Sequence, residues 1–304
     1  MSASVVITTL NEANSIVALL DSLASQTLKP SEIVVVDAGS TDQTLSLIKS
    51  WQAAHPAPTI RTLVAKGANR SLARNLGIRK AKSTIIAVTD AGCRADRHWL
   101  ERLVRPIENL KADSVAGFYQ PITETPFQQA VAPFVAVMPN QFNPDTYLPS
   151  SRSVAFTKDA WRVAGGYPGH LNYCEDLVFA RALKSQTRLA VAPGAIVHWR
   201  QVSTLPQFFR QIATYARGDW EADYTPHLLK IISVFLRYTI FIFVKPLFLL
   251  YLFWPILKHS RQSRDPQVLI WAPALQLTAD AAIIFATITF FLPFPRITPQ
   301  PQSV

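Results

Sequence analysis

The chain has 304 residues and a formal net charge of +10. Hydrophobic residues make up 49% of it and charged residues only 16%, which excludes a disordered protein, a coiled coil and a highly charged soluble domain. Two cysteines, Cys93 and Cys174, are too few for a multi-disulfide scaffold or a cysteine-only metal cluster.

Short apolar runs alternate with helical patterns over the first ninety residues. Strands are expected at 4–8, 32–36, 60–65 and 83–89, and helices at 13–25, from Thr41 or Asp42 onward, and at 71–81. The run Ile33 to Val36 has no polar interruption, as burial on both faces of a parallel sheet requires. This alternation predicts an α/β fold with a doubly wound, mostly parallel sheet.

Polar residues stand at the ends of three predicted strands: Thr8, Asp37 and Asp90. In doubly wound sheets, ligands bind beyond the carboxyl ends of the strands, so these side chains are expected to face a ligand. The first turn, Thr8 to Glu12, contains no glycine, which argues against a nicotinamide dinucleotide site. Side chains, chiefly acidic ones, are therefore expected to contact the ligand.

Six segments carry a family resemblance through their order along the chain. They are VVITTLNE, IVVVDAGSTDQT, ANRSLARNLGIRKA, TDAGC, AGGYPGHLNYCEDLVFARAL and FFRQIATYARG. Together they resemble family 2 glycosyltransferases of the GT-A fold over roughly residues 4–220. The resemblance implies a Rossmann-like GT-A domain over residues 1–220 that binds a nucleotide-diphosphate sugar and transfers the sugar to a hydroxyl acceptor.

The resemblance assigns the donor's base and ribose to Glu12 and Asp37, with Thr8 lining the base. Both acidic residues have structural alternatives: Glu12 can belong to a helix cap, and Asp37 can make an Asx turn. A carboxylate that ends a buried strand at the ligand edge of a sheet favours a functional role for Asp37.

Three arginines are expected to meet the diphosphate, because a guanidinium group matches phosphate geometry. Arg70 and Arg74 flank the start of a helix that faces the same crevice, and Arg70 is favoured of the two. Arg210 lies in a basic helix after the core. The alternative for Arg70 and Arg74 is a solvated helix face.

A metal is implied by the place of Asp90, which matches the first residue of the family's Asp-x-Asp motif. Mg²⁺ or Mn²⁺ prefers oxygen ligands and keeps phosphate in its coordination shell. The chain departs from the motif because Gly92 replaces the second carboxylate. Asp90 then holds the metal alone, or Asp96 replaces that carboxylate, or the metal is held more loosely. His198 matches a further metal ligand of GT-A enzymes, with a structural histidine as the alternative.

The catalytic residues are expected at Glu175 and Asp176, at the start of an amphipathic helix. The helix dipole favours negative charge there, which is the structural alternative. By resemblance Asp176 is the general base, which takes the proton of the acceptor hydroxyl as its oxygen attacks the anomeric carbon. Attack opposite the leaving diphosphate inverts the stereochemistry. The glycine-rich segment 165–169 is interpreted as a lid over the acceptor.

The last part of the chain is apolar and contains no glycine after Gly218. Residues 221–296 are expected to be membrane-associated helices with one or two transmembrane spans, and residues 297–304 a loose tail. Tyr238–Leu257 and Val268–Phe294 are both long enough to cross a bilayer. Asp280 in the second run is expected to make a polar inter-helix contact or to serve a function.

The number of membrane crossings stays open. Two crossings would place the basic connector, residues 258–264, opposite the catalytic domain, against the usual cytoplasmic excess of basic residues. In the alternative, residues 228–257 lie in the interface or re-enter, and only the last run spans. The catalytic domain is expected to face the cytoplasm, since residues 1–10 have no signal-peptide pattern.

The sequence therefore predicts an inverting, membrane-bound glycosyltransferase with a nucleotide-diphosphate sugar donor, a lipid-linked or other membrane-associated acceptor, and no nucleic acid partner. One alternative is a catalytically weakened homologue that serves as a membrane-bound partner or scaffold, suggested by Gly92. A polysaccharide synthase needs more spans than the chain offers.

Overall fold

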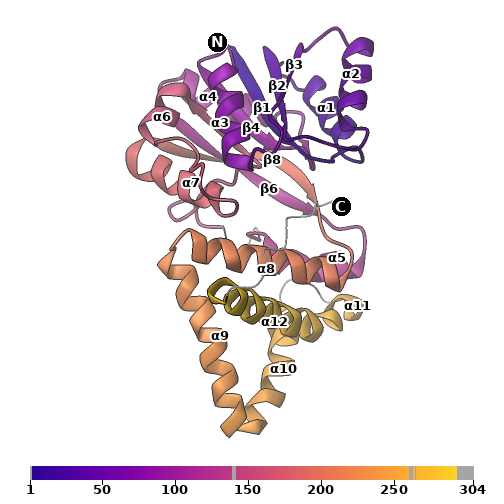
Figure 1. The fold of residues 1–304 in the computed structure, drawn as a ribbon, viewed down its shortest axis with the longest axis vertical. Helices are drawn as coiled ribbons and strands as arrows, with labels where there is room; N and C mark the ends of the chain where they lie inside the picture. Colours follow the sequence, from indigo (N-terminus) through magenta and orange to yellow (C-terminus); the bar gives the residue numbers. More distant parts are fainter. Residues whose placement is uncertain (1, 139–141, 260–262, 264, 293–304) are drawn as a thin grey trace. The chain divides into compact units, whose positions relative to one another are not determined.

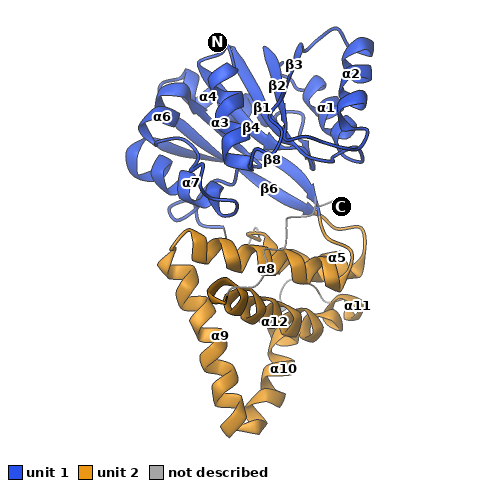
Figure 2. Cartoon of the chain, viewed as in Figure 1, with its two compact units in different colours: residues 1–121, 142–200, 299–304 blue, residues 122–141, 201–298 orange. Residues whose placement is uncertain are grey.

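The structure is a computed structural model that describes residues 2–138, 142–259, 263 and 265–292. The predicted tail at 297–304 and residues 260–262 and 264 of the basic connector lie outside these ranges. The described chain divides into two compact units (Figure 2). The first unit holds residues up to 121 and 142–200, and the second holds 122–138 and the residues after 200. The sequence analysis placed a domain boundary at residue 220, whereas the second unit takes over at residue 201 and also includes residues 122–138.

The first unit is an α/β fold with helices on both faces of one sheet (Figure 1). Its strands are β1 (Ala3–Thr9), β2 (Glu32–Asp37), β3 (Ile60–Val64), β4 (Ile85–Asp90), β5 (Cys93–Ala95), β6 (Ser114–Ile122), β7 (Val154–Thr157) and β8 (Leu189–Arg200). Its helices are α1 (Ile16–Ala24), α2 (Thr44–Ala54), α3 (Arg70–Lys80), α4 (Trp99–Glu108), α6 (Lys158–Val163) and α7 (Glu175–Gln186). The strands and helices expected in the first ninety residues are all present.

The strands form one sheet of eight in the order β3-β2-β1-β4-β7-β6-β8-β5. Strands β3, β2, β1 and β4 are parallel, as predicted. Strand β7 pairs antiparallel with both β4 and β6, and β5 pairs antiparallel with β8. The sheet is therefore mixed: its parallel half carries the predicted ligand edge.

Two apolar layers hold the helices against the sheet. One face packs on α1, α2 and α4 through buried residues such as Leu20, Trp51 and Trp99. The other face packs on α3, α6 and α7 through residues such as Ile78 and Phe179.

Gly77 allows α3 to pack close to the sheet. A Cβ at this position would lie 2.6 Å from the Val6 side chain and 3.1 Å from that of Val36. Only a residue without a side chain permits this approach. The contact places Arg74, one helical turn earlier, at the carboxyl ends of the strands.

The second unit is helical: α5 (Pro126–Val135), α8 (Leu205–Glu221), α9 (Thr225–Phe243), α10 (Lys245–His259), α11 (Pro266–Leu269) and α12 (Trp271–Phe291). Two of its helices, Thr225–Phe243 and Pro266–Phe291 (α11 and α12 counted together), are long and apolar enough to cross a membrane. Composition and length alone support this, and both properties also fit a buried core helix.

The apolar run Tyr238–Leu257 is divided between two helices. Helix α9 ends at Phe243 and α10 begins at Lys245, with Val244 at φ −123° and ψ 71° between them. Pro246 contributes to the break, because it has no N–H with which to continue the helical hydrogen bonds of α9. Helices α9 and α10 therefore form a hairpin (Figure 1).

Candidate functional site

Three predicted site residues meet at one edge of the parallel sheet. In the strand register, Thr8 of β1 lies opposite Val36 of β2 and opposite Asp90 of β4. Thr9, the next residue, lies opposite Asp37. The two aspartates therefore flank the end of β1 at the edge where α/β sheets bind ligands.

Asp37 is fully buried, and its carboxylate accepts hydrogen bonds from backbone N–H groups and hydroxyls of nearby residues. Oδ1 accepts from the backbone N–H groups of Gly39 (2.9 Å) and Ser40 (2.8 Å). Oδ2 accepts from the hydroxyls of Thr9 (3.0 Å) and Ser40 (2.5 Å). The Asx turn considered from the sequence is thus present, and it shapes the loop after β2. A contact between Asp37 and a nucleotide stays a prediction.

Glu12 follows β1 and is half-buried. Its Oε2 accepts from the Ser15 hydroxyl (2.5 Å), and its backbone N–H donates to Thr44 Oγ1 (2.8 Å). Burial raises the pKa of Glu12, and the charge of Asp90 raises it further, while the Ser15 hydroxyl and Arg70 oppose the shift. Since Asp90 and Arg70 both act on Glu12, the three charged groups share one region.

Arg74 joins two carboxylates from distant parts of the chain. Its Nη2 donates to Asp90 Oδ1 at 2.8 Å, and its Nη1 donates to Glu175 Oε1 at 2.6 Å. The guanidinium also lies 5.3 Å from the centre of the Tyr167 ring. The Arg74 and Glu175 side chains are almost fully buried, whereas that of Asp90 is 31% exposed. Arg74 thus connects the end of β4 to the start of α7.

The charges in this bridge reinforce one another. Burial works against ionisation of Asp90, but the neighbouring guanidinium groups of Arg74 and Arg152 lower its pKa overall. Burial likewise disfavours the charge of Arg74, and Asp90 and Glu175 outweigh it and raise the pKa. Asp90 is therefore ionised at neutral pH, and Arg74 is a permanent cation between two acidic groups.

Helix α7 presents Glu175 and Asp176 in different environments. It begins after Cys174, whose φ of 55° is unusual for a residue with a side chain. Glu175 points inward to Arg74, and Asp176 is half-exposed. Asp176 Oδ2 accepts from Ser150 Oγ at 3.2 Å, and its Oδ1 accepts from the N–H of Leu177 at 2.9 Å. Asp176 is thus the more accessible of the two acids.

Comparison with known proteins identifies the family of the chain. The sequence model of "Glycosyl transferase family 2" matches residues 4–158, which include β1 to β7 and the Arg74–Asp90 contact. The chain belongs to this family.

Curated relatives of the family 2 chain match over shorter stretches. Glycosyltransferase AglE of Haloferax volcanii is 35% identical over 117 residues, which are 38% of each chain. Glycosyltransferase GlyA of Streptococcus pneumoniae is 29% identical over 122 residues, 40% of this chain and 17% of that protein. The chain therefore matches well under half the length of these relatives.

Solved structures show the fold over more of the family 2 chain. Mannosyltransferase PcManGT from Pyrobaculum calidifontis, in complex with GDP-Man and Mn²⁺, has a TM-score of 0.62 at 17% identity and covers 95% of this chain and 86% of its own. S. aureus TarS 1-349 in complex with UDP has a TM-score of 0.53 at 21% identity, over 74% and 67%. These likenesses show the GT-A fold of the chain.

Arg152, which the sequence analysis did not single out, lies beside the predicted site residues of this family 2 chain. Its guanidinium lies 4.0 Å from the centre of the Trp199 ring and 5.1 Å from that of Tyr119. Its Nη1 donates to Ser150 Oγ (3.2 Å), the hydroxyl that also contacts Asp176. Arg152 is thus linked to the predicted base through Ser150, and its charge helps to lower the pKa of Asp90. No periodicity in the sequence distinguishes it.

The glycine-rich segment predicted as a lid is anchored to α3. The Asn75 side chain accepts from the N–H of Tyr167 (3.0 Å) and donates to its carbonyl (2.7 Å). Asn69 donates to the carbonyls of Gly169 (2.8 Å) and Leu171 (3.2 Å). The helix that carries Arg74 therefore also holds the chain that leads to Asp176. Motion of a lid stays a prediction.

The predicted metal ligands lie in two arrangements. Asp90 contacts Arg74. His198, on β8, has its Nε2 2.7 Å from Oδ1 of Asp96, the residue that follows β5. Among the described residues, no group of three or more histidine, cysteine, aspartate or glutamate side chains is placed to hold a metal ion. The half-exposed oxygens of Asp90 have the chemistry for Mg²⁺ or Mn²⁺, and a metal here would depend on the donor's phosphates for further ligands.

The remaining predicted arginines differ in their positions. Arg70 is exposed at the first position of α3. Its charge helps to lower the pKa of Asp90 and opposes the rise in the pKa of Glu12. Arg210 is exposed on α8 of the second unit, and its Nε donates to the carbonyl of Pro206 at 3.3 Å. Their contacts with a diphosphate stay predictions.

Proposed function

We propose that the chain is an inverting glycosyltransferase that moves a sugar from a nucleotide-diphosphate donor to a hydroxyl of a membrane-associated acceptor. The observation that carries the proposal is the Arg74 bridge, which joins the donor-side Asp90 to the start of α7, where Asp176 stands. Donor-side and acceptor-side acids from β4 and α7 thus belong to one site. A single transfer reaction requires this proximity.

In the proposed reaction, Asp176 takes the proton of the acceptor hydroxyl. The acceptor oxygen forms a bond to the anomeric carbon as the bond from that carbon to the diphosphate oxygen breaks, so the nucleoside diphosphate leaves with the electron pair. The half-exposed position of Asp176 leaves room for an acceptor, and Ser150 orients its carboxylate.

Positive charge around the donor is the second requirement, because the leaving diphosphate gains negative charge. We propose that Arg70 binds the phosphates. Arg74 instead orients Asp90, because its terminal nitrogens already donate to Asp90 and Glu175. Asp90 would hold a Mg²⁺ or Mn²⁺ ion, with His198 as a further candidate. When bound, the ion would stabilise charge on the phosphates.

The donor class is supported by the neighbours in fold, since PcManGT is solved with GDP-Man and Mn²⁺ and TarS with UDP and with UDP-GlcNAc. The base and the sugar for this chain are left to experiment. The apolar helices of the second unit support attachment to a membrane. We further propose that the catalytic unit lies on the cytoplasmic side and that the acceptor is lipid-linked.

The first experiment is a thermal-shift panel of nucleoside diphosphates and their sugars, each with and without Mn²⁺. A ligand that binds only the folded chain raises the melting temperature. We expect one base to give a clear rise that increases with Mn²⁺. No response to any nucleotide would contradict the donor site.

The second experiment measures donor turnover with the nucleotide identified by the panel. Asp176→Asn should bind the nucleotide as wild type does and lose turnover. Equal, residual turnover in both proteins would instead favour the scaffold interpretation. The exposed Asp145 of the first unit offers Asp145→Asn as the matched control.

A further inference from the structure

Helix α12 packs as a core helix of the second unit, despite its apolar composition. Its residues Leu275 and Ala279 share one buried cluster with Phe208 and Ile212 of α8. Near the other end, Trp220 Nε1 of α8 donates to Thr287 Oγ1 of α12 at 3.0 Å. Helix α8 lies along α12 (Figure 1).

The helix that lies along α12 is too polar for the interior of a bilayer. Helix α8 carries Arg210, Arg217 and Glu221, and the last two form an ion pair at 3.2 Å. Charged side chains at the centre of a membrane cost roughly 2.5–3.5 kcal/mol each on translocon insertion scales. A crossing by α12 would carry this helix with it or break their shared core. The packing therefore argues against a span.

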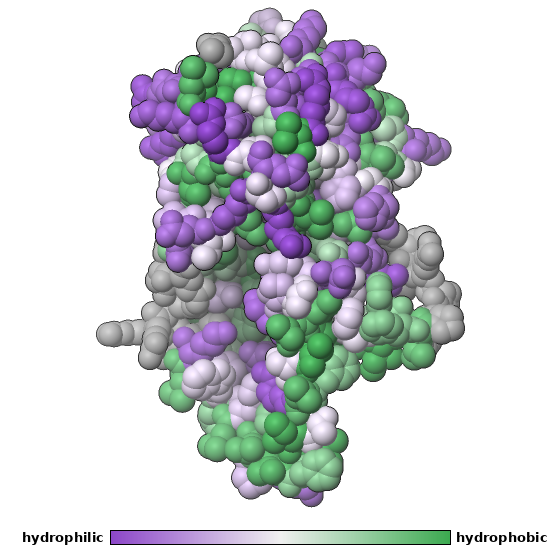
Figure 3. All heavy atoms as spheres, turned by 90° about the vertical axis from the view of Figure 1, so that its left-hand side faces the viewer, coloured by the Kyte–Doolittle hydropathy of each residue, from purple (hydrophilic) through white to green (hydrophobic). Residues whose placement is uncertain are grey.

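The α9–α10 hairpin has the opposite character. In the most apolar stretch of α9 only 11% of residues are buried, against 33% in the corresponding stretch of α12. Large apolar side chains cover its surface, and the most exposed are Ile242, Phe243, Leu250, Leu257 and Phe253. The lower end of the molecule in Figure 3, which is this hairpin in Figure 1, is mostly hydrophobic.

A polar cluster fixes the hairpin to α12. The buried carboxylate of Asp280 accepts from the hydroxyls of Tyr251 (2.6 Å) and Tyr238 (3.2 Å). Arg237 donates to the Tyr251 hydroxyl at 2.9 Å and lies 3.8 Å from Asp280. The cluster joins α9 and α10 to α12 part-way along both helices, and its level is taken as the base of the apolar tip formed by the residues nearer the turn.

The distance from this base to the turn sets how deep the hairpin can insert. Phe243 lies six residues beyond Arg237, or about 9 Å of helix at 1.5 Å per residue. Half of the hydrocarbon core is about 15 Å thick. The apolar tip is therefore long enough to enter one leaflet and too short to cross the bilayer.

Charge identifies the surface that the hairpin meets. From Tyr224 to Arg264 the sequence has six lysines and arginines and no aspartate or glutamate. Such a segment is attracted to anionic lipid headgroups.

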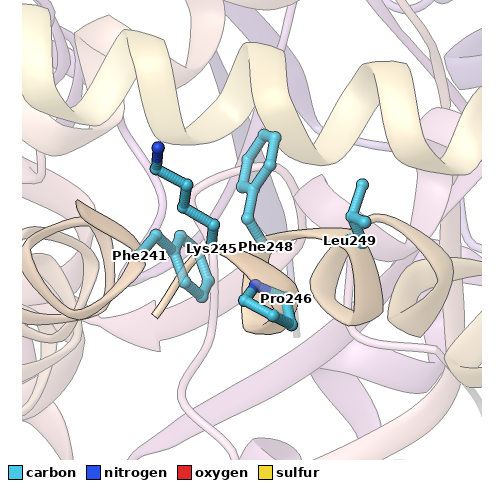
Figure 4. Close-up of a pocket in the computed structure, with 5 residues that line it drawn as sticks. All are labelled: Phe241, Lys245, Pro246, Phe248 and Leu249. Carbon is cyan, nitrogen blue, oxygen red and sulfur yellow. The ribbon is translucent and has the colours of Figure 1, made fainter. Parts of the chain in front are cut away.

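The one charge at the turn belongs to Lys245. It borders a hollow lined by Phe241, Pro246, Phe248 and Leu249, and its side chain extends away from Pro246 (Figure 4). A lysine can bury its aliphatic stem among such rings while its ammonium group reaches the phosphates.

We infer that the α9–α10 hairpin is a re-entrant anchor, which enters one leaflet of an anionic bilayer and returns to the same side, and that α12 stays outside the hydrocarbon core. This rests on the membrane attachment proposed above and specifies its geometry. It also differs from both topologies that the sequence left open, because in each of them the last apolar run crosses the membrane.

Two cysteine reporters test the inference in the full chain, with Cys174 changed to serine. Cys93 is buried and should not react. Val244→Cys places a spin label at the turn, and Ala281→Cys places one on the exposed side of α12 near its middle. With vesicles of phosphatidylglycerol and phosphatidylcholine, we expect the label at 244 to lie within one leaflet and the label at 281 to stay at headgroup level. An impermeant maleimide should reach residue 281 from the protein's side of the vesicle and residue 244 from neither side.

Two results would overturn the inference. If residue 281 is the deeper site, α12 crosses the membrane. If residue 244 reacts only from inside the vesicle, the hairpin crosses it completely.

A flotation assay with the same vesicles separates the anchor from the enzyme. Phe243→Asp should weaken vesicle binding at least tenfold. Ile270→Asp, at a residue of the second unit that is 74% exposed against 81% for Phe243, should change it less than twofold. Equal loss in both variants would contradict the hairpin as the anchor. If the wild type does not float but its melting temperature responds to nucleotides, membrane attachment fails while the donor site stands.

Discussion

The two units each bury a carboxylate beside an arginine, and they differ in what closes the network. In the first unit, Arg74 lies between Glu175 and Asp90, and Asp90 is 31% exposed. In the second unit, Asp280 is 2% exposed and is surrounded by tyrosine hydroxyls and Arg237. The first network therefore reaches solvent through Asp90, whereas the carboxylate of the second is enclosed by the protein. We propose the donor site at the first network, and the second joins α9 and α10 to α12.

The largest expected effect concerns Asp176, the half-exposed acid that follows Glu175 of the first network. Asp176→Asn removes the proposed base and keeps the acceptor atom for the Ser150 hydroxyl. A general base contributes about 10²–10⁴-fold to a rate, so we expect turnover to fall by that factor with little change in stability. Steady-state kinetics and thermal unfolding measure the two. A variant that retains at least half of the wild-type rate would remove Asp176 from the mechanism.

The next effect tests the buried part of the same network. Arg74→Met leaves Glu175 without its cation, and breaking a buried ion pair costs about 3–5 kcal/mol. We expect the free energy of unfolding to fall by this amount in urea titrations. Arg79→Met, at an exposed arginine of the same helix, should change it by less than about 0.5 kcal/mol.

Lowering the pH should remove much of the difference in the free energy of unfolding between wild type and Arg74→Met. The pKa of Asp90 is lowered in the folded chain, so its pairing stabilises the fold above the unfolded pKa near 3.9 and is lost as the pH falls through the folded value. A stability difference that stays constant down to pH 2 would contradict the role of the pair.

The Asp280 cluster of the second unit should affect stability without affecting nucleotide binding. Asp280→Ala deprives two tyrosine hydroxyls of their acceptor and Arg237 of its nearest carboxylate, at a cost of about 1–3 kcal/mol. Tyr238→Phe, which removes the longer of the two hydroxyl contacts, should cost less. Thermal unfolding in detergent ranks the variants. Nucleotide-induced shifts should be unchanged in both, and loss of nucleotide binding would show that the cluster serves the site.

The smallest effect concerns Glu12. Because its folded pKa is raised, its charged form destabilises the fold at neutral pH, and this penalty disappears as the pH falls through the folded value towards the unfolded one. Glu12→Gln should therefore raise the melting temperature at pH 7 by no more than about 2 °C and weaken nucleotide binding. At pH 4 the gain in melting temperature should vanish. A variant with unchanged nucleotide binding would remove Glu12 from the donor site.

The parallel half of the sheet was predictable because its signals are local. Strands β1 to β4 are apolar runs with polar ends, and parallel strands place Asp37 and Asp90 at one edge whatever the rest of the chain does. Helix α7 and its two leading acids follow from a local pattern in the same way. The order and pairing of strands β5 to β8 were not predicted, because they depend on neighbours far along the chain.

The amino-acid sequence alone determined the family, the α/β alternation and the residues at the strand ends, since each depends on residue type and short-range spacing. Tertiary structure decided which charges meet: Arg74 was expected to face phosphate, and it lies between Asp90 and Glu175, 16 residues and 101 residues away. It also decided that the apolar α12 packs beside α8 while the hairpin is exposed. Partners and burial are properties of packing between distant segments, and no local periodicity encodes them.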